Sequence, residues 1–267
     1  MTEHAYDLSI PHPNIPQLIE VMDAEASAFR AAHPPQFSPV GTLGRAIDIF
    51  IPEGQVKGAV AMVHGGYWVR GAPTNISHLA AGALACDVAV GFVPYGLCPE
   101  FSIGDAIDHT IDAANIIADT LGYPVAMFGH SAGGHLAASV VSEGVSTDAV
   151  LLSGLYDLSP ITKIPLNETL GMTEDDALRW SPSRKPPMGP TAVAAFVGSE
   201  EPSGFLDQQQ ILAEKWGAAC GLTTEVLAGG DHFSALATLT APDSALTAAL
   251  VTAAINAVTR PTLRSTS

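Results

Sequence analysis

Charged residues are scarce in this chain of 267 residues, and most of those present are acidic. Lysine and arginine together number 11 against 27 aspartates and glutamates, which gives a formal net charge of −16. A field of this sign repels polyanions, so we do not expect nucleic-acid binding. Neutral or cationic small molecules are compatible with it as binding partners.

Cysteine is also scarce, and long apolar runs are missing. The three cysteines, Cys86, Cys98 and Cys220, are far apart and odd in number, which argues against a disulfide framework and a structural zinc site. No apolar stretch reaches the roughly 20 residues of a membrane-spanning helix. The polar start, Met1–His4, lacks the basic-then-apolar order of a signal peptide. We therefore expect a cytoplasmic protein that makes no membrane contact.

Ligand spacing for metals is missing as well. No pair of histidines or carboxylates stands at a ligand spacing together with a third partner. We therefore expect neither a metal ion nor another cofactor.

Apolar residues make up 47% of the sequence, enough for a sheet buried on both faces. Short strand-like runs alternate with helix-like runs, and no linker interrupts them. The expected strands are 46–51, 60–63, 88–93, 125–128, 149–152, 193–197 and 224–227, and the expected helices are 76–84, 105–120, 135–141, 205–219 and 244–258. This alternation predicts an α/β fold with a mostly parallel sheet and helices on both faces, in one domain spanning 1–267 with its core at 44–258.

Other segments frame that core. Residues 1–43 form a proline-rich N-terminal arm, in which apolar residues at helical spacing predict a helix at 15–30. The arm either covers an active site or serves packing alone. The proline-rich segment 160–190 is a short insertion expected near the pocket mouth, and 259–267 is a C-terminal tail. The apolar helix 244–258 either packs on its own sheet or meets a twofold partner in a homodimer.

A serine between small residues follows the strand predicted at 125–128. In Gly129-His130-Ser131-Ala132-Gly133, the small side chains permit a strand to turn sharply into a helix. Such a turn strains the backbone and presents Ser131 Oγ to a substrate. The helix start beneath it aims free N–H groups at developing negative charge. The pattern is that of a nucleophile elbow.

Two glycines, Gly65 and Gly66, directly follow the strand predicted at 60–63. Glycine lets backbone amides approach a ligand closely. Acyl transfer develops an oxyanion in its tetrahedral intermediate, and each preorganised N–H donor lowers the barrier by roughly 3 kcal/mol. We assign these donors to the backbone of Gly65, Gly66 and Ala132. An ordinary tight turn is the alternative for the two glycines.

Two aromatic residues, Tyr67 and Trp68, come next in the chain. Their position suits an aromatic wall beside the acyl carbon of a substrate. Core packing is the alternative for both side chains.

A serine nucleophile needs a general base, and that base needs an orienting carboxylate. In elbow folds the chain order is serine, then acid, then histidine. His232 follows a predicted strand in a glycine-containing loop and fits that order. His135 lies one turn along the elbow helix, where it would point away from Ser131 Oγ. His64 and His130 flank the glycine turns and are expected to hold backbone geometry or line the pocket floor.

Several carboxylates compete for the orienting position. Glu201 stands in a loop at the carboxyl end of a predicted strand, where it can be aimed at His232, and we favour it. Glu200, Asp157 and Asp207 are the alternatives. Asp157 follows another strand, but a turn carboxylate that caps nearby N–H groups is the preferred interpretation for it.

These residues together resemble the α/β-hydrolase superfamily and, within it, the esterase and kynurenine formamidase (arylformamidase) branch. The resembling segments are His64–Trp68, Gly129–Leu136, Ser153–Leu158, Ala177–Pro182, Gly198–Gln208 and Asp231–Phe233. The resemblance implies an α/β-hydrolase sheet of about eight strands and a triad of Ser131, Glu201 and His232. Family members usually carry aspartate at the acid position, three or four residues ahead of a phenylalanine. Here Glu201 and Phe205 fill those two places.

The resemblance also implies an activity. We expect a metal-independent serine hydrolase that cleaves a small ester or an N-formyl or N-acyl arylamide through an acyl-enzyme on Ser131. A carboxylesterase and an arylformamidase share all of these parts, so the triad leaves the substrate open. A non-catalytic binding protein on the same fold is the alternative from a different functional class.

Overall fold

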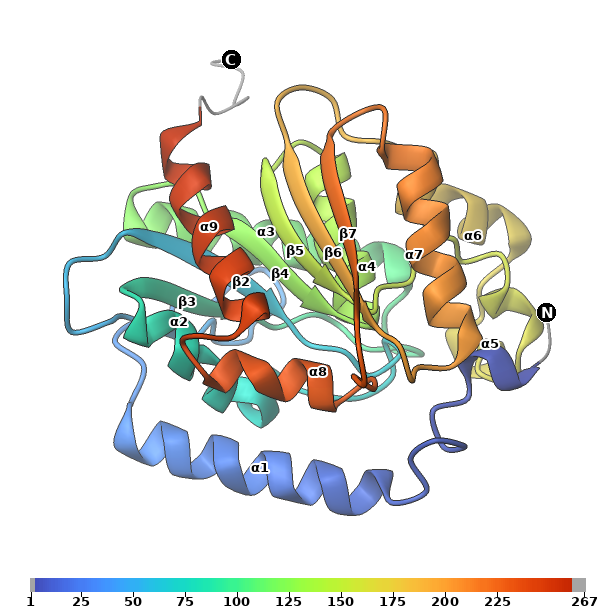
Figure 1. The fold of residues 1–267 in the computed structure, drawn as a ribbon, viewed down its shortest axis with the longest axis horizontal. Helices are drawn as coiled ribbons and strands as arrows, with labels where there is room; N and C mark the ends of the chain where they lie inside the picture. The colour runs from blue at the N-terminus through green and yellow to red at the C-terminus, as the bar shows by residue number, and fades with distance from the viewer. Residues whose placement is uncertain (1–2, 261–267) are drawn as a thin grey trace.

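A computed structural model describes residues 3–260; residues 1–2 and 261–267, and with them most of the tail expected at 259–267, lie outside it. Its central element is a sheet whose strands are ordered β1-β3-β2-β4-β5-β6-β7 (Figure 1). The strands are β1 (Ile49–Phe50), β2 (Gly58–Val63), β3 (Val88–Val93), β4 (Ala126–His130), β5 (Asp148–Leu152), β6 (Ala192–Gly198) and β7 (Gly221–Leu227). Every neighbouring pair is parallel except β1 and β3. The mostly parallel sheet predicted from the sequence is confirmed.

Within residues 3–260 the sheet has seven strands, one fewer than the approximate number of eight expected. The segment before β1 pairs only through isolated antiparallel bridges, Phe37 with Ile49 and Val40 with Ala46. Three prolines lie within three residues of Phe37. Because proline has no N–H to donate, a continuous ladder cannot extend through this segment.

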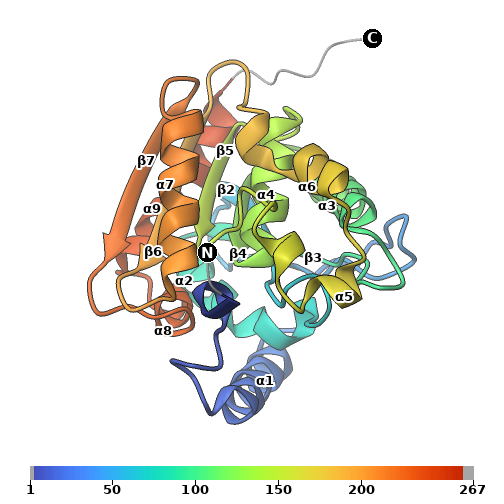
Figure 2. The same ribbon diagram turned by 90° about the vertical axis from the view of Figure 1, so that its right-hand side faces the viewer.

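Helices cover both faces of the sheet. The α-helices are α1 (Ile15–Ala32), α2 (Ala81–Ala85), α3 (Ile103–Leu121), α4 (Ala132–Ser142), α5 (Asn167–Leu170), α6 (Glu174–Trp180), α7 (Ser203–Trp216), α8 (Ser234–Ala237) and α9 (Ala245–Thr259). The 3₁₀ helices are η1 (Glu3–Tyr6), η2 (Pro73–Ala80), η3 (Ile161–Lys163), η4 (Pro182–Arg184) and η5 (Thr238–Thr240). Seen along the sheet in Figure 2, α9 lies on one side and α3, α4 and α6 lie on the other.

The hydrophobic core is divided by the sheet into two clusters. All six residues of β2 are buried. Ala59, Ala61 and Val63 share a cluster with α3, α4 and α7. Val60 and Met62, which alternate with them, share the other cluster with α2 and α9. A strand covered on both faces requires this period of two. The alternation fixes the register of β2 in the sheet, and with it the position of the residues that follow Val63.

Helix α9 contains no charged side chain, and the face formed by Leu246, Leu250 and Ala254 is buried. It packs against β2, β4 and β5. Among the described residues, no single helix is long and apolar enough to cross a membrane. Ser234–Thr240 and Ala245–Thr259 meet such a criterion only as a pair, with a bend of 61° between them.

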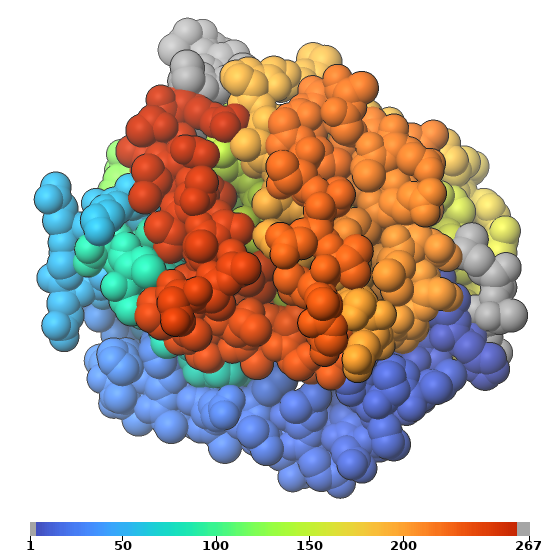
Figure 3. All heavy atoms as spheres, viewed as in Figure 1, coloured from blue at the N-terminus to red at the C-terminus, as the bar shows by residue number. Residues whose placement is uncertain are grey.

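The N-terminal arm wraps one side of the molecule (Figure 3). Its helix α1 packs on η2, and Ala26 is its one fully buried residue in the described part. Several polar contacts fasten it to the core. In the two shortest, Asn75 Nδ2 donates to Asp23 Oδ1 at 2.7 Å, and Arg30 Nη2 lies 2.7 Å from Asp48 Oδ2. The insertion at 160–190 is more regular than expected, since it holds η3, α5, α6 and η4.

Gly58, at the start of β2, marks a close approach to α9. A Cβ atom at this position would lie 2.5 Å from the carbonyl oxygen of Ala254. Because that oxygen belongs to a helix backbone, the helix or the strand must shift. We expect Gly58→Ala to lower the free energy of unfolding by about 1–3 kcal/mol, measured by urea denaturation.

Gly144→Ala is the matched control. Gly144 has a φ of +74° and nothing within 4 Å of the added Cβ, so the substitution introduces only backbone strain of about 1 kcal/mol. A Gly58→Ala protein no less stable than Gly144→Ala would contradict the close packing of α9.

Candidate active site

Ser131 stands alone between β4, which ends at His130, and α4, which begins at Ala132. Its backbone has φ 57° and ψ −121°, a conformation that costs a non-glycine residue about 1–3 kcal/mol. Backbone hydrogen bonds hold it there: Ser131 N donates to Leu152 O at 2.9 Å, and Ser131 O accepts from Gly134 N at 2.9 Å and from His135 N at 3.2 Å. The sharp strand-to-helix turn predicted from the small residues is present.

The glycines around Ser131 are sites of close backbone approach. A Cβ on Gly129 would lie 2.0 Å from Gly133 O, and one on Gly133 would lie 2.2 Å from Val63 O. Real Cβ atoms do not come this close to other atoms, so β4, α4 and the end of β2 can meet only through glycine. The turn at Ser131 therefore packs directly against the segment that follows Val63.

Glu201 and His232 meet in the loops that follow β6 and β7. Glu201 Oε2 lies 2.7 Å from His232 Nδ1, and the two side chains are 0% and 2% exposed. The other carboxylate oxygen, Oε1, accepts hydrogen bonds from Gly198 N at 2.8 Å and from Ser153 Oγ. Because both oxygens are engaged, the carboxylate cannot rotate, and it fixes the orientation of the imidazole.

The competing carboxylates lie elsewhere. Glu200 and Asp207 are exposed. Asp157 Oδ1 accepts a hydrogen bond from Ser159 N at 2.9 Å, which is the turn-capping role preferred for it. Of the four candidates, the structure brings only Glu201 to His232.

Ser131 and His232 line one pocket of about 640 Å³, which is in the range of small-molecule sites. Within residues 3–260, no hydrogen bond joins Ser131 Oγ to the His232 ring. Such bonds are often long in unliganded enzymes and shorten when substrate binds. The relevant geometry is therefore that both residues line the same cavity.

The expected oxyanion donors surround Ser131. Gly65 and Gly66 line the same pocket, and a Cβ on Gly65 would lie 3.1 Å from Ser131 Cβ. Ala132 is buried at the first position of α4, where helix geometry provides no acceptor for its N–H. Gly65 thus lies beside Ser131 in space, Gly66 shares its pocket, and Ala132 follows it in the chain.

Tyr67 and Trp68 separate, although they are adjacent in sequence. Tyr67 lines the pocket, and its hydroxyl donates to Tyr6 O at 2.6 Å. Trp68 is fully buried in the core, where its Nε1 donates to His135 Nδ1 at 3.3 Å. The aromatic-wall prediction is therefore wrong for Trp68. Both residues have positive φ, 52° and 60°, in a tight turn that sends the second side chain inward.

His64 and His130, beside the two glycine turns, contact backbone carbonyl oxygens, as expected for residues that fix the backbone geometry. His130 Nε2 lies 2.8 Å from His232 O, and His64 Nδ1 lies 2.7 Å from Gly65 O. Burial lowers the pKa of His64 to about 4 and the pKa of His130 well below its usual 6.5. Repulsion from His232 lowers the pKa of His130 further. Both rings are therefore neutral at neutral pH.

The arm and the insertion supply much of the pocket wall. Its apolar lining includes Leu8, Ile15, Ile19 and Met22 from the arm and Ile164 and Leu166 from the insertion. Of the two roles left open for the arm, covering the site is the one observed. The insertion lies at the pocket as predicted.

Sequence reasoning missed Ser153, which supports Glu201. Ser153 directly follows β5 and has a φ of 52°. It stands at the carboxyl end of a parallel strand, where reactive residues gather in such sheets. The rule that pointed to Ser131 could therefore have pointed to it.

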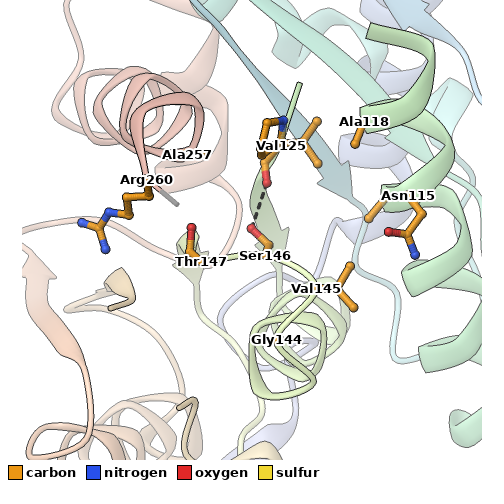
Figure 4. Close-up of a pocket in the computed structure, with 11 residues that line it drawn as sticks. Asn115, Ala118, Val125, Gly144, Val145, Ser146, Thr147, Ala257 and Arg260 are labelled. Atoms are coloured by element: carbon orange, nitrogen blue, oxygen red, sulfur yellow. Dashed lines mark hydrogen bonds between the residues drawn. The ribbon is translucent and has the colours of Figure 1, made fainter. Parts of the chain in front are cut away.

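A second, much smaller hollow lies at the N-terminal ends of β4 and β5, away from Ser131 (Figure 4). Its polar groups are already used: Ser146 Oγ donates to Val125 O at 2.8 Å, and Arg260 Nη1 donates to Pro190 O at 3.0 Å. Its volume of about 30 Å³ is too small for a substrate. In the described part of the chain, no cluster of three or more histidine, cysteine or acidic side chains is placed to hold a metal ion.

A sequence profile for the alpha/beta hydrolase fold matches residues 60–225 of this chain. The chain belongs to the α/β-hydrolase family. Kynurenine formamidase from Salmo salar is 28% identical over 227 residues, which are 78% of this chain and 77% of that protein.

Solved structures agree with this assignment. The crystal structure of a putative thioesterase from Silicibacter sp. tm1040 has a TM-score of 0.84 and 31% identity, covering 92% of this α/β hydrolase and 97% of that chain. A thermophilic carboxylesterase from a metagenomic library has a TM-score of 0.71 over 92% of this chain and 97% of its own. At 21% identity, the second similarity shows the fold alone.

The buried neutral histidines predict acid sensitivity. His64 and His135 have pKa values lowered to about 4 by burial, against 6.5 in an unfolded chain. Between these pH values the unfolded chain binds more protons than the folded protein, so the free energy of unfolding falls as the pH falls. From pH 7 to pH 5, urea denaturation should show a loss of about 2 kcal/mol for each such histidine.

His135→Gln isolates one of these contributions, because glutamine fills a similar space and does not titrate. The loss of stability between pH 7 and pH 5 should be smaller in this variant than in the wild type. A free energy of unfolding that stays constant over this range in the wild-type protein would contradict the neutral burial of these rings.

Proposed function

We propose that this α/β hydrolase is a serine hydrolase in which Ser131 is the nucleophile, His232 the general base and Glu201 the orienting acid. The observation that carries the proposal is the buried contact of 2.7 Å between Glu201 and His232 on the pocket that Ser131 lines. A carboxylate on Nδ1 selects the tautomer that leaves Nε2 able to accept a proton. The strained turn at Ser131 exposes its hydroxyl to the same cavity.

The first half of the reaction forms an acyl-enzyme. Ser131 Oγ bonds to the substrate carbonyl carbon while its proton passes to His232, and the carbonyl electron pair moves onto oxygen. The amides of Gly65, Gly66 and Ala132 stabilise that oxyanion. When the intermediate collapses, His232 gives the proton to the departing alcohol or amine.

The second half releases the acid. Water gives a proton to His232 and attacks the acyl carbon, and Ser131 recovers its proton as the acyl group leaves. The acyl-enzyme divides one difficult hydrolysis into two easier steps. The same three side chains and three amides serve both halves.

The pocket supports a small ester or an N-formyl or N-acyl arylamide as substrate. Most of its lining is apolar, with Phe128, Phe233 and Leu236 beside the side chains from the arm and the insertion. Such a surface suits an aromatic or aliphatic leaving group and offers little to a strongly hydrated one. The similarity to a kynurenine formamidase supports the arylamide, and the similarity to a putative thioesterase supports an activated ester.

Ser131→Ala should lower kcat by about 10⁴-fold or more, because it removes the hydroxyl on which the proposed acyl-enzyme forms. Initial rates on a p-nitrophenyl ester measure this effect. Ser139→Ala is the matched control, since Ser139 lies on the same helix and its hydroxyl donates to His135 O. Turnover by Ser131→Ala at the wild-type rate would refute the mechanism.

Two neighbouring glutamates provide an internal comparison. Glu201→Gln should lower kcat by about 10³- to 10⁴-fold, because a neutral amide no longer stabilises the protonated imidazole. Glu200→Gln should leave kcat unchanged, since Glu200 is exposed. If the two variants behaved in the opposite way, Glu200 would be the orienting acid.

A substrate panel decides between ester and amide. Short p-nitrophenyl esters, an aryl thioester and N-formylkynurenine should be compared by kcat/KM, each beside the Ser131→Ala control. We expect hydrolysis of at least one of them that disappears in the control. A protein inactive on the whole panel would count against the proposed function.

A further inference from the structure

Tyr95 lies behind the two glycines of the proposed oxyanion site and outside the pocket lining. It follows β3 by two residues and is 1% exposed. Its ring stacks on that of His64, with centroids 4.3 Å apart and planes 20° from parallel. The mechanism above gives no role to this buried hydroxyl.

The hydroxyl of Tyr95 and the ring of His64 face two successive backbone carbonyls. Tyr95 Oη lies 3.0 Å from His64 O and 3.2 Å from Gly65 O. His64 Nδ1 lies 2.7 Å from Gly65 O and 3.2 Å from Tyr95 Oη. The Tyr95 hydroxyl and His64 Nδ1 each have one proton to donate. The shortest contacts therefore assign the Nδ1–H to Gly65 O and the tyrosine O–H to His64 O.

These two hydrogen bonds fix the directions of two amides. In a trans peptide, the N–H points opposite to the C=O of the same unit. The hydrogen bond to His64 O therefore points the Gly65 N–H away from Tyr95. The hydrogen bond to Gly65 O likewise points the Gly66 N–H away from His64 Nδ1. Tyr95 lies outside the pocket lining, whereas both glycines line the pocket beside Ser131.

The two glycines need these hydrogen bonds because their own backbone conformation is not restricted by a side chain. Gly66 has a φ of +111°, and with no side chain its peptide can rotate at little cost. A rotated peptide would present a carbonyl oxygen to the developing oxyanion and raise the barrier. An amide network held from behind prevents this rotation without touching the substrate.

We propose that Tyr95 is a positioning residue for the oxyanion site, which acts through the carbonyls of His64 and Gly65 to aim the Gly65 and Gly66 amides at the reacting oxygen. The inference rests on the proposed serine-hydrolase function and adds to it a residue outside the triad. Burial raises the pKa of Tyr95 well above its usual range, so the hydroxyl stays protonated as a donor.

Tyr95→Phe tests the proposal, since phenylalanine keeps the stacked ring and removes only the hydroxyl. We expect kcat to fall about 10- to 100-fold with KM changed less than about twofold, because the lost alignment matters only when the oxyanion forms. The affinity for an aryl trifluoromethyl ketone, whose adduct with Ser131 carries an oxyanion, should fall by the same factor. Tyr123→Phe, a tyrosine beyond the end of α3, should leave all three quantities unchanged.

Two results would overturn the proposal. One is a folded Tyr95→Phe protein whose kcat lies within twofold of the wild type. The other is a fall in kcat without a matching fall in ketone affinity, which would indicate a structural role alone. A wild-type protein that hydrolyses no substrate of the panel would instead remove the proposed function itself.

A second pair of variants carries the test if Tyr95→Phe does not fold. His64→Asn places an amide N–H close to the position of Nδ1, whereas His64→Leu places none there. We expect kcat to be about tenfold higher in His64→Asn than in His64→Leu. Equal kcat values in the two variants would overturn the role given to this carbonyl network.

Discussion

The buried contact between Glu201 and His232 is the interaction on which the whole site depends. It joins the loop after β6 to the loop after β7, and the Ser153 hydroxyl ties the loop after β5 to the same carboxylate. These loops can approach because Gly198 lies against Gly230 O, where a Cβ would be only 2.2 Å away. Breaking this contact would remove the imidazole from a fully buried carboxyl group, which is unfavourable because a buried polar group needs its partners.

Backbone strain is concentrated at the same end of the sheet. Among residues 3–260, five non-glycine residues have positive φ, and four of them follow the carboxyl ends of β2, β4 or β5: Tyr67, Trp68, Ser131 and Ser153. Each costs about 1–3 kcal/mol and persists only where the surroundings hold it. The two-sided core around β2 and β4 supplies that support. The fold thus uses part of its stability to present one hydroxyl and several amides in fixed directions.

Much of the fold could be predicted because its signals are local. The run at 125–128, the small residues after it and the glycines after 60–63 each determine a strand end and a turn by themselves. The position of Glu201 after a predicted strand favoured its pairing with His232, and the family resemblance strengthened that choice, although Glu200 is equivalent to Glu201 in local pattern. Its bonds to Ser153, Gly198 and His232 bring together the ends of β5, β6 and β7, so they cannot be read from any one segment.

Other features escaped prediction because they depend on distant contacts. Trp68 was placed beside the substrate, yet the turn sends it to His135 in the core. Tyr95 is separated from His64 by a helix-bearing crossover, so no spacing rule connects them. The missing eighth strand reflects the prolines near Phe37, whose effect on pairing shows only once the partner strand is known.

Reaction with a fluorophosphonate, followed by mass spectrometry of the peptides, tests the central claim most directly. This reagent modifies a serine only when a nearby base activates it. If Glu201, His232 and the strained turn act together, one equivalent of adduct should form on Ser131, with Ser153 unmodified. A protein that forms no adduct, or forms it elsewhere while Ser131 stays intact, would contradict the account.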